Sequence, residues 1–262
     1  MVSRFSSQTS AQVNRKVKVD GAVSPWNPFE LDIADTSLVA INSVFRQVVF
    51  FNRGDPKFFA QWGWTDNRNR LILTTGYESR RLAEQNLSLR WNLNRQWTAQ
   101  LSLAKGDRES EAELFDNKDF RIRFYQAEPQ LTWLVNTQFR TQLIYRYRDN
   151  LNTLGLGAEA SLLHDFRLET TMQFNGRDPD RNRDMVLRSK LSLVKVDFQG
   201  QANSPVGFAL LEGLQQGNNY LWNLSLDRNL SRNLQLSLSY DGRKTGDARI
   251  VHTGRAQIAA RF

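Results

Sequence analysis

Hydrophobic and polar residues alternate with a period of two along most of the chain. In residues 220–227 one face carries Tyr220, Trp222, Leu224 and Leu226, and the other carries Asn223, Ser225 and Asp227. The same alternation recurs in residues 87–93, 97–103, 139–148 and 234–241. Repeated alternation of this kind predicts β-strands that are apolar on one face only.

The length of these segments separates two classes of β-protein. A soluble β-sandwich has strands of about 5–6 residues, whereas a tilted strand that crosses a bilayer needs about 9–11 residues. Alternating segments here reach ten or more residues, and their polar face carries charges of both signs. We therefore expect an all-β fold, a transmembrane antiparallel up-and-down β-barrel, with the soluble sandwich as the alternative.

The last segment supports the membrane interpretation. Counted back from the end, Phe262, Ala260, Ile258 and Ala256 share one face, and Arg261, Gln257, Arg255 and Thr253 share the other. A terminal aromatic residue preceded by apolar residues at alternate positions resembles the C-terminal signature of bacterial outer-membrane barrels. The sequence thus predicts a strand that ends at Phe262.

The direction of each strand follows if Phe262 lies on the periplasmic side. Such barrels have short periplasmic turns and longer outer loops. Counting backwards predicts outer connections at residues 105–118, 203–217 and 244–247, and inner connections at 66–69, 94–96, 134–138, 176–184 and 230–233. Residues 158–175 keep their apolar side chains in one phase, so we expect one strand there rather than a hairpin at His164-Asp165.

The strand count is even, as closed barrels of this type prefer. Residues 57–262 supply eleven segments, and residues 1–20 supply a first strand with Phe5, Ala11 and Val13 on its apolar face. The total of about twelve strands predicts either a closed twelve-stranded barrel or one arc of a larger barrel.

Residues 21–56 interrupt the alternation. Leu38, Ile41, Phe45 and Val48 recur at spacings of three and four, and Gly54-Asp55-Pro56 follows them. This spacing predicts one short amphipathic helix at residues 37–49, inside a long N-terminal loop. A strand in the same place is the alternative.

Composition narrows the class of protein further. The chain has 262 residues, 35 basic and 27 acidic side chains for a net charge of +8, and no cysteine. The longest apolar run, residues 206–211, is far shorter than the roughly 20 residues of a membrane helix. Basic residues are scattered along one face of successive strands, so we expect no nucleic acid as a partner. The first twenty residues lack the apolar core of a secretory signal, which suggests a fragment of a longer precursor.

Four strings resemble large outer-membrane proteins of the Bacteroidota type. They are IADTSLVAINSVFRQVVFFNRGDPKF, YESRRLAEQNLSLRW, NSPVGFALLEGLQQGNNYLW and LSLSYDGRKTGDARIVHTGRAQIAARF. In that poorly characterised group they lie in the C-terminal β-barrel region of much longer chains. The resemblance covers most of the chain from Asp35 onward, implies a barrel in the outer membrane, and supplies no catalytic residue.

Candidate chemistry is sparse. The two histidines, His164 and His252, fall in the apolar phase of their strands, so we interpret them as residues near the bilayer interface and expect no enzyme. No His, Asp and Glu spacing matches a metal site and no glycine motif matches a phosphate loop, so we expect no metal and no cofactor. A lipid- or glycan-modifying barrel enzyme is the weakest alternative.

The charged face is the set of residues with functional potential. Its predicted lumen-facing members are Arg90, Arg140, Arg146, Arg167, Arg188, Lys190, Arg255, Glu159, Glu169, Asp227 and Asp241. Basic rings in a pore favour anions, but opposite charges on adjacent strands also pair with one another. Aromatic residues near the strand ends predict interfacial belts: Trp91, Trp97, Trp133, Phe139 and Phe262 inside, with Tyr147, Phe198, Tyr220 and Tyr240 outside.

These features predict an integral outer-membrane barrel that acts as anchor or scaffold for a larger envelope assembly. Its partners are outer-membrane lipid and proteins that dock on the long loops at residues 21–56 and 203–217. The second loop carries an apolar patch of docking candidates, Val206, Phe208, Leu210 and Leu211. A pore for small anionic solutes is the alternative function.

Overall fold

The computed structural model describes residues 4–18, 38–154, 159–174, 185–231 and 233–260. Twelve strands form one antiparallel sheet in which each strand pairs with its neighbours in sequence. They are β1 (Phe5–Val17), β2 (Leu38–Phe51), β3 (Phe58–Leu73), β4 (Gly76–Asn92), β5 (Trp97–Ala112), β6 (Phe120–Leu134), β7 (Phe139–Asn152), β8 (Ala160–Phe174), β9 (Met185–Gln199), β10 (Gly217–Ser231), β11 (Leu234–Thr245) and β12 (Val251–Ala260). A 3-10 turn, η3 (Asp116–Lys118), precedes β6, and a short helix, α1 (Pro205–Leu211), precedes β10. In these ranges no helix is long and apolar enough to cross a membrane.

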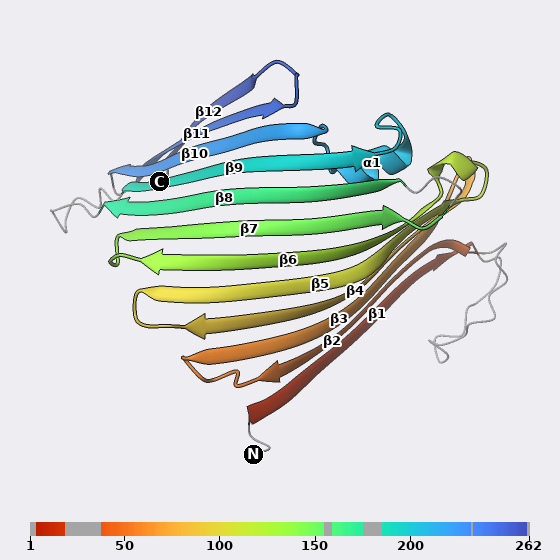
Figure 1. Ribbon diagram of the computed structural model, residues 1–262, viewed down its shortest axis with the longest axis horizontal. Helices are drawn as coiled ribbons and strands as arrows, with labels where there is room; N and C mark the ends of the chain where they lie inside the picture. Colours follow the sequence, from red (N-terminus) through yellow and green to blue (C-terminus); the bar gives the residue numbers. More distant parts are fainter. Residues whose placement is uncertain (1–3, 19–37, 155–158, 175–184, 232, 261–262) are drawn as a thin grey trace.

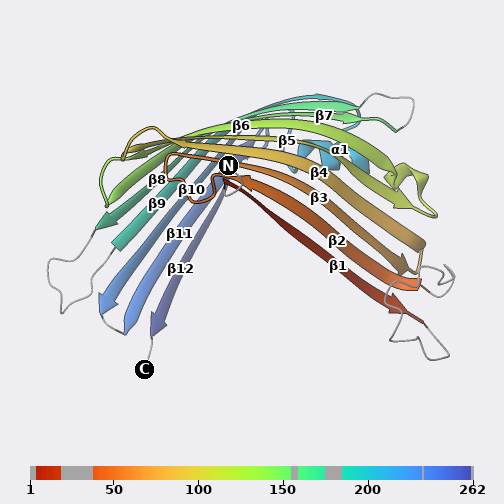
Figure 2. The ribbon, with the colours of Figure 1, turned by 90° about the horizontal axis from the view of Figure 1, so that it is seen from below.

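The sheet bends into an open arch. Figure 1 shows the strands side by side in chain order, and Figure 2 shows that β1 and β12 form the two separate margins of the arch. No pairing joins β1 to β12 within the described ranges. The predicted all-β, up-and-down architecture of about twelve strands is therefore confirmed, in the form of an arc rather than a closed barrel.

The two ends of the arch differ in their connections. One end, the helix end, carries residues 74–75, 113–119, 200–216 with α1, and 246–250. The opposite end, the short-turn end, carries residues 52–57, 93–96 and 135–138. Two of its turns are built alike, because Asn94 and Asn136 each accept backbone hydrogen bonds of 2.8 Å from the second and third residues after them. Asparagine stabilises such turns through its side-chain oxygen, so the sequence dictates these two connections, as predicted.

The predicted helix at residues 37–49 is wrong, because residues 38–51 form β2. The apolar residues recur at spacings of three and four because both faces of β2 carry some of them. Val44 and Val48 lie on one face, and Ile41 and Phe45 lie on the other. Residues 19–37, the rest of the predicted loop, lie outside the described residues.

The predicted turn at residues 66–69 is also wrong, because β3 runs unbroken from Phe58 to Leu73. The two errors compensate in the strand count: ten strands rather than eleven follow residue 57, and β2 supplies the missing one. The outer connection predicted at 105–118 is shorter than expected, since β5 continues to Ala112. The single strand predicted at 158–175 is confirmed as β8, whereas the connection at 176–184 and Phe262 lie outside the described residues.

Candidate functional site

The register of the sheet assigns every strand residue to one of two faces. Asp165 of β8 pairs with Val194 of β9, which pairs with Asn219 of β10, so these three side chains share a face. Figure 2 shows α1 on the inner side of the arch, where it packs against this face. We call it the concave face and the opposite one the convex face.

All eleven predicted lumen-facing residues belong to the concave face. The strand pairings from β4 to β12 place the ten strand residues among them on this face. Glu159, which precedes β8, accepts a hydrogen bond of 3.2 Å from Asn152 Nδ2 of the same face. Because side chains alternate with a period of two along each strand, the register brings side chains from seven strands to one surface. That this surface lines a lumen stays a prediction.

Ion pairs within the described part of the chain hold six of these eleven residues: Arg146, Arg167, Arg188, Lys190, Glu169 and Asp227. Arg188 Nη1 lies 2.6 Å from Asp227 Oδ2, and Lys190 Nζ lies 3.5 Å from Glu169 Oε1. Asp241 accepts a hydrogen bond of 2.6 Å from Asn223 Nδ2. These contacts cross from one strand to the next, so the concave charges tie adjacent strands together.

Asp165 is the most deeply buried acid of the concave face, with 2% of its surface exposed. Its carboxylate accepts hydrogen bonds of 2.6 Å from Arg167 Nη2 and 2.5 Å from Ser192 Oγ, and Arg146 Nη2 lies 3.6 Å away. A buried carboxylate is tolerated only when charges and donors compensate its lost hydration. The cluster therefore fixes β7, β8 and β9 against one another.

Helix α1 covers the concave face of β8 and β9 near the helix end. Ser204 caps it by accepting a hydrogen bond of 2.9 Å from Gly207 N, and Pro205 follows at the first helical position. Val206, Leu210 and Leu211 are at most 7% exposed and pack with Leu163, Val194, Val196 and Phe198 of the sheet. The predicted exposed apolar patch is therefore wrong for these three residues, because the sheet already covers them. Phe208 alone of the four remains exposed, at 67%.

Ion pairs hold the C-terminal end of α1 against the sheet. Glu212 takes a left-handed conformation, with φ of 53°, and lies 2.8 Å from Arg148 Nη1 and 3.8 Å from Arg146 Nη1. The sequence reasoning placed Arg146 in the lumen but missed Glu212 and Arg148 as its neighbours. The dipeptide Ser204-Pro205 is the sequence signal that indicates the start of α1.

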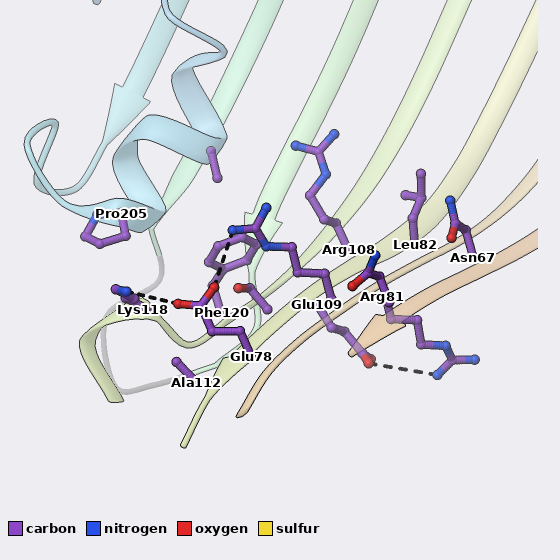
Figure 3. Close-up of a pocket in the computed structure, with 14 residues that line it drawn as sticks. Asn67, Glu78, Arg81, Leu82, Arg108, Glu109, Ala112, Lys118, Phe120 and Pro205 are labelled. Atoms are coloured by element: carbon purple, nitrogen blue, oxygen red, sulfur yellow. Dashed lines mark hydrogen bonds and ion pairs between the residues drawn. The ribbon is translucent and has the colours of Figure 1, made fainter. Parts of the chain in front are cut away.

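Two cavities flank α1 on the concave face. The first, of about 510 Å³, lies between α1, η3 and strands β3 to β6, and Figure 3 shows its lining side chains. Glu78 is bound there by Lys118 Nζ at 3.1 Å and Arg80 Nη2 at 3.7 Å, while Arg108 reaches in from β5. The second, of about 790 Å³, is lined by Arg146, Arg167, Lys190 and Arg243 together with Asp165, Glu212 and Asp241. Both are lined by charged side chains of both signs.

The convex face carries the apolar half of the alternation. Its large exposed hydrophobic side chains include Trp62, Trp91, Leu103, Leu131, Trp133, Leu143, Phe166, Leu168, Leu191, Leu193, Leu224, Leu238, Tyr240 and Ile258. Near the short-turn end, Trp97 and Trp133 stack with ring centroids 5.3 Å apart. An apolar face of this extent does not suit water and matches the hydrocarbon band of a spanning barrel. Phe198, predicted for the outer aromatic belt, instead lies in the core beneath α1.

Both histidines lie on the convex face, in the apolar phase as predicted. His164 Nδ1 is 2.7 Å from Tyr145 Oη, and His252 Nδ1 is 2.8 Å from Tyr240 Oη. The two pairs have the same diagonal cross-strand geometry. In the described part of the chain, neither histidine hydrogen-bonds a serine, so no serine–histidine nucleophile is assembled there.

Comparison with solved structures identifies the fold. The siderophore receptor PirA from Acinetobacter baumannii superposes with a TM-score of 0.65 at 8% identity, over 98% of this chain and 41% of the receptor. The siderophore receptor PirA from Pseudomonas aeruginosa gives 0.53 at 10% identity, over 84% of this chain and 37% of the receptor. No family model and no curated protein matches the sequence.

The fold is that of an outer-membrane β-barrel. The chain spans about two-fifths of the length of the two receptors. At this identity the likeness shows the fold alone, and the predicted Bacteroidota relationship stays a prediction.

Proposed function

We propose that this chain is a wall segment of a wide barrel in the bacterial outer membrane and that it anchors a larger envelope assembly. The observation that carries the proposal is the division of one sheet into two surfaces. The convex face carries a broad band of exposed apolar side chains, whereas the concave face carries charged side chains, many of them paired, and is partly covered by α1. This division is what lipid on one side and a polar interior on the other require.

The free margins of the sheet support a barrel wider than twelve strands. β1 and β12 present unpaired backbone groups along their outer edges in the described structure. Such groups cost several kcal/mol each in hydrocarbon, so an open sheet does not persist in a bilayer. Further strands therefore complete the wall, from the same protein or from another one.

The concave face favours an anchor over a pore. Arg188, Lys190 and Arg167 are each paired with a carboxylate of the same face. Helix α1 also occupies the concave side with a packed core. A packed helix and charges that pair across strands support a structural role.

Docking of partners would involve the helix end. Phe208 on α1, Leu114 after β5 and Leu154 after β7 are 67%, 66% and 45% exposed. All three lie in connections at the same end of the arch. Exposed apolar side chains on the connections of one end suit contact with a protein partner.

The test is a native pull-down from detergent-solubilised outer membranes. A stoichiometric partner, retained by wild type and lost from Phe208→Ser with Leu114→Ser, supports the anchor. Leu191→Ser serves as the control, since its 50% exposed side chain lies on the convex face away from the helix end. A bait that purifies alone from native membranes contradicts the proposal.

An anion pathway is the second candidate, and one observation favours it. Arg140 and Arg255 lie on the concave face, and neither has an ion-pair partner among the described residues. Cations of this kind attract anions to a pore. If the completed barrel conducts, Arg140→Glu should shift its reversal potential toward cation selectivity. Absence of single-channel conductance excludes this candidate.

A further inference from the structure

The convex side of β4, β5 and β6 changes character along the strands. Toward the short-turn end, directly paired rows are apolar: Trp91–Ala99–Leu131, Leu89–Leu101–Pro129 and Leu87–Leu103–Ala127. Toward the helix end, the rows are Gln85–Lys105–Tyr125, Ala83–Asp107–Arg123 and Arg81–Glu109–Arg121. The border between apolar and charged rows therefore passes between Leu103 and Lys105.

A cavity of about 340 Å³ lies at this border. Its convex lining includes Trp64, Lys105, Arg123 and Tyr125, with Asp107 beside them. Trp64 and Tyr125 are 38% and 52% exposed, so their rings frame the opening. Aromatic rings with a polar edge prefer the depth at which headgroups meet acyl chains.

A separate, apolar cavity of about 560 Å³ lies on the convex side of β3 to β7, toward the short-turn end. It is lined by Leu89, Leu101, Leu131 and Leu143, and Ala99 and Pro129 contribute short side chains to it. Lys105 and Leu101 are four residues apart on β5, which corresponds to about 13 Å along the strand. The polar and apolar cavities thus follow one another along β5 and β6.

The cations at the border are only partly neutralised. Arg123 Nε lies 3.3 Å from Asp107 Oδ1, and both side chains are about half exposed, at 53% and 41%. Lys105 has no ion-pair or hydrogen-bond partner among the described residues. The neighbouring acids Asp66 and Glu109 are already bound by arginines: Arg81 lies 2.9 Å from Asp66, and Arg121 lies 2.8 Å from Glu109. The border cavity therefore offers an ammonium group and spare guanidinium donors to a ligand.

We propose that this pair of cavities binds one anionic, phosphate-bearing lipid in the leaflet nearer the helix end. Its phosphate accepts hydrogen bonds from Lys105 and Arg123, and an acyl chain follows the apolar cavity past Leu101 and Pro129. The inference rests on the proposed membrane location. A lipid fits better than a soluble anion because the apolar cavity lies along the same strands as the cationic one and needs an apolar occupant.

The test uses the full protein in nanodiscs of equal parts phosphatidylglycerol and phosphatidylcholine. Native mass spectrometry after release counts the lipids that remain bound. Wild type should retain phosphatidylglycerol over phosphatidylcholine, and Lys105→Gln with Arg123→Gln should reduce that preference about fivefold for each cation removed. Lys195→Gln is the matched control, since Lys195 is a convex-face cation, 59% exposed, that lies away from both cavities.

The outcomes separate three cases. Failure of the wild-type barrel, complete with the strands that close its margins, to enter nanodiscs contradicts the proposed function itself. Insertion with equal retention of both lipids, or an unchanged preference in the double variant, overturns the lipid site alone. Displacement of the lipid by millimolar inorganic phosphate shows a simple anion site and also overturns the proposal.

Discussion

Ser161 of β8 joins the sheet to α1 by donating a hydrogen bond of 2.9 Å from its Oγ to the backbone oxygen of Leu210. The same hydroxyl accepts a hydrogen bond of 2.9 Å from Asn150 Nδ2 of β7. Ser161 and Asn150 are each 2% exposed. Two strands and one helix thus meet at a buried polar link, surrounded by the apolar core of the concave face.

Leu210→Ala should release α1 from the sheet. The side chain is 0% exposed, and removal of a buried leucine side chain costs about 2–5 kcal/mol. Limited proteolysis of the protein in detergent should show faster cleavage within residues 200–216. Phe208→Ala, on the same helix but 67% exposed, is the control and should leave the cleavage rate unchanged. Equal cleavage of both variants would contradict the packing of α1.

Asp165→Asn should destabilise the whole sheet. The change removes the charge that compensates Arg167 and Arg146, and loss of one partner from a buried ion pair costs about 3–5 kcal/mol. Unfolding by urea in micelles, followed by tryptophan fluorescence, measures the effect. Asp241→Asn, which alters an exposed contact with Asn223, should stay within about 1 kcal/mol of wild type. A similar midpoint for both variants would show that the Asp165 cluster is not structural.

Gly242→Ala should displace the ring of Trp222. A methyl group at Gly242 would lie 2.0 Å from Trp222 Cε2, and overpacking of this kind costs about 1–3 kcal/mol. Near-ultraviolet circular dichroism should report the altered tryptophan environment. Gly254→Ala offers a matched control on the next strand and the same face, since a methyl group there meets nothing within 4 Å. If the Gly242 variant keeps the wild-type spectrum, the ring does not cover that glycine.

The period of two located the strands wherever one face is uniformly apolar. It placed β8 as one strand because Leu162, Phe166 and Leu168 keep a single phase across His164-Asp165. It failed in β3, where Asp66 and Arg68 lie on the convex face beyond the apolar rows and resemble a turn. Asp66 is instead held by Arg68 and Arg81 at 2.9 Å each. The alternation ends because the strand extends past the apolar band, not because the chain turns.

Contacts across the concave face cannot be predicted from the sequence pattern. The alternation predicts that Arg146 and Arg167 share the charged face. Their common ion-pair partner, Asp165, follows only from the register of β7 with β8. The burial of Leu210 depends on the folding of residues 200–216 back onto β8 and β9. Such long-range packing cannot be inferred from local periodicity, so the sequence pattern alone predicts an exposed apolar patch at residues 206–211.

Single-cysteine scanning along β5 in lipid vesicles tests the central claim most directly, that the convex face meets lipid and the concave face a polar interior. The chain has no cysteine, so each substitution introduces a unique thiol. Cysteines at Leu101 and Leu103 should resist a water-soluble maleimide, whereas those at Gln100, Ser102 and Asp107 should react. Positions 100 to 103 alternate between the concave and the convex face, and Asp107 lies on the convex face beyond the apolar rows. Uniform reactivity along residues 100–103, with no alternation, would contradict a strand embedded in a bilayer.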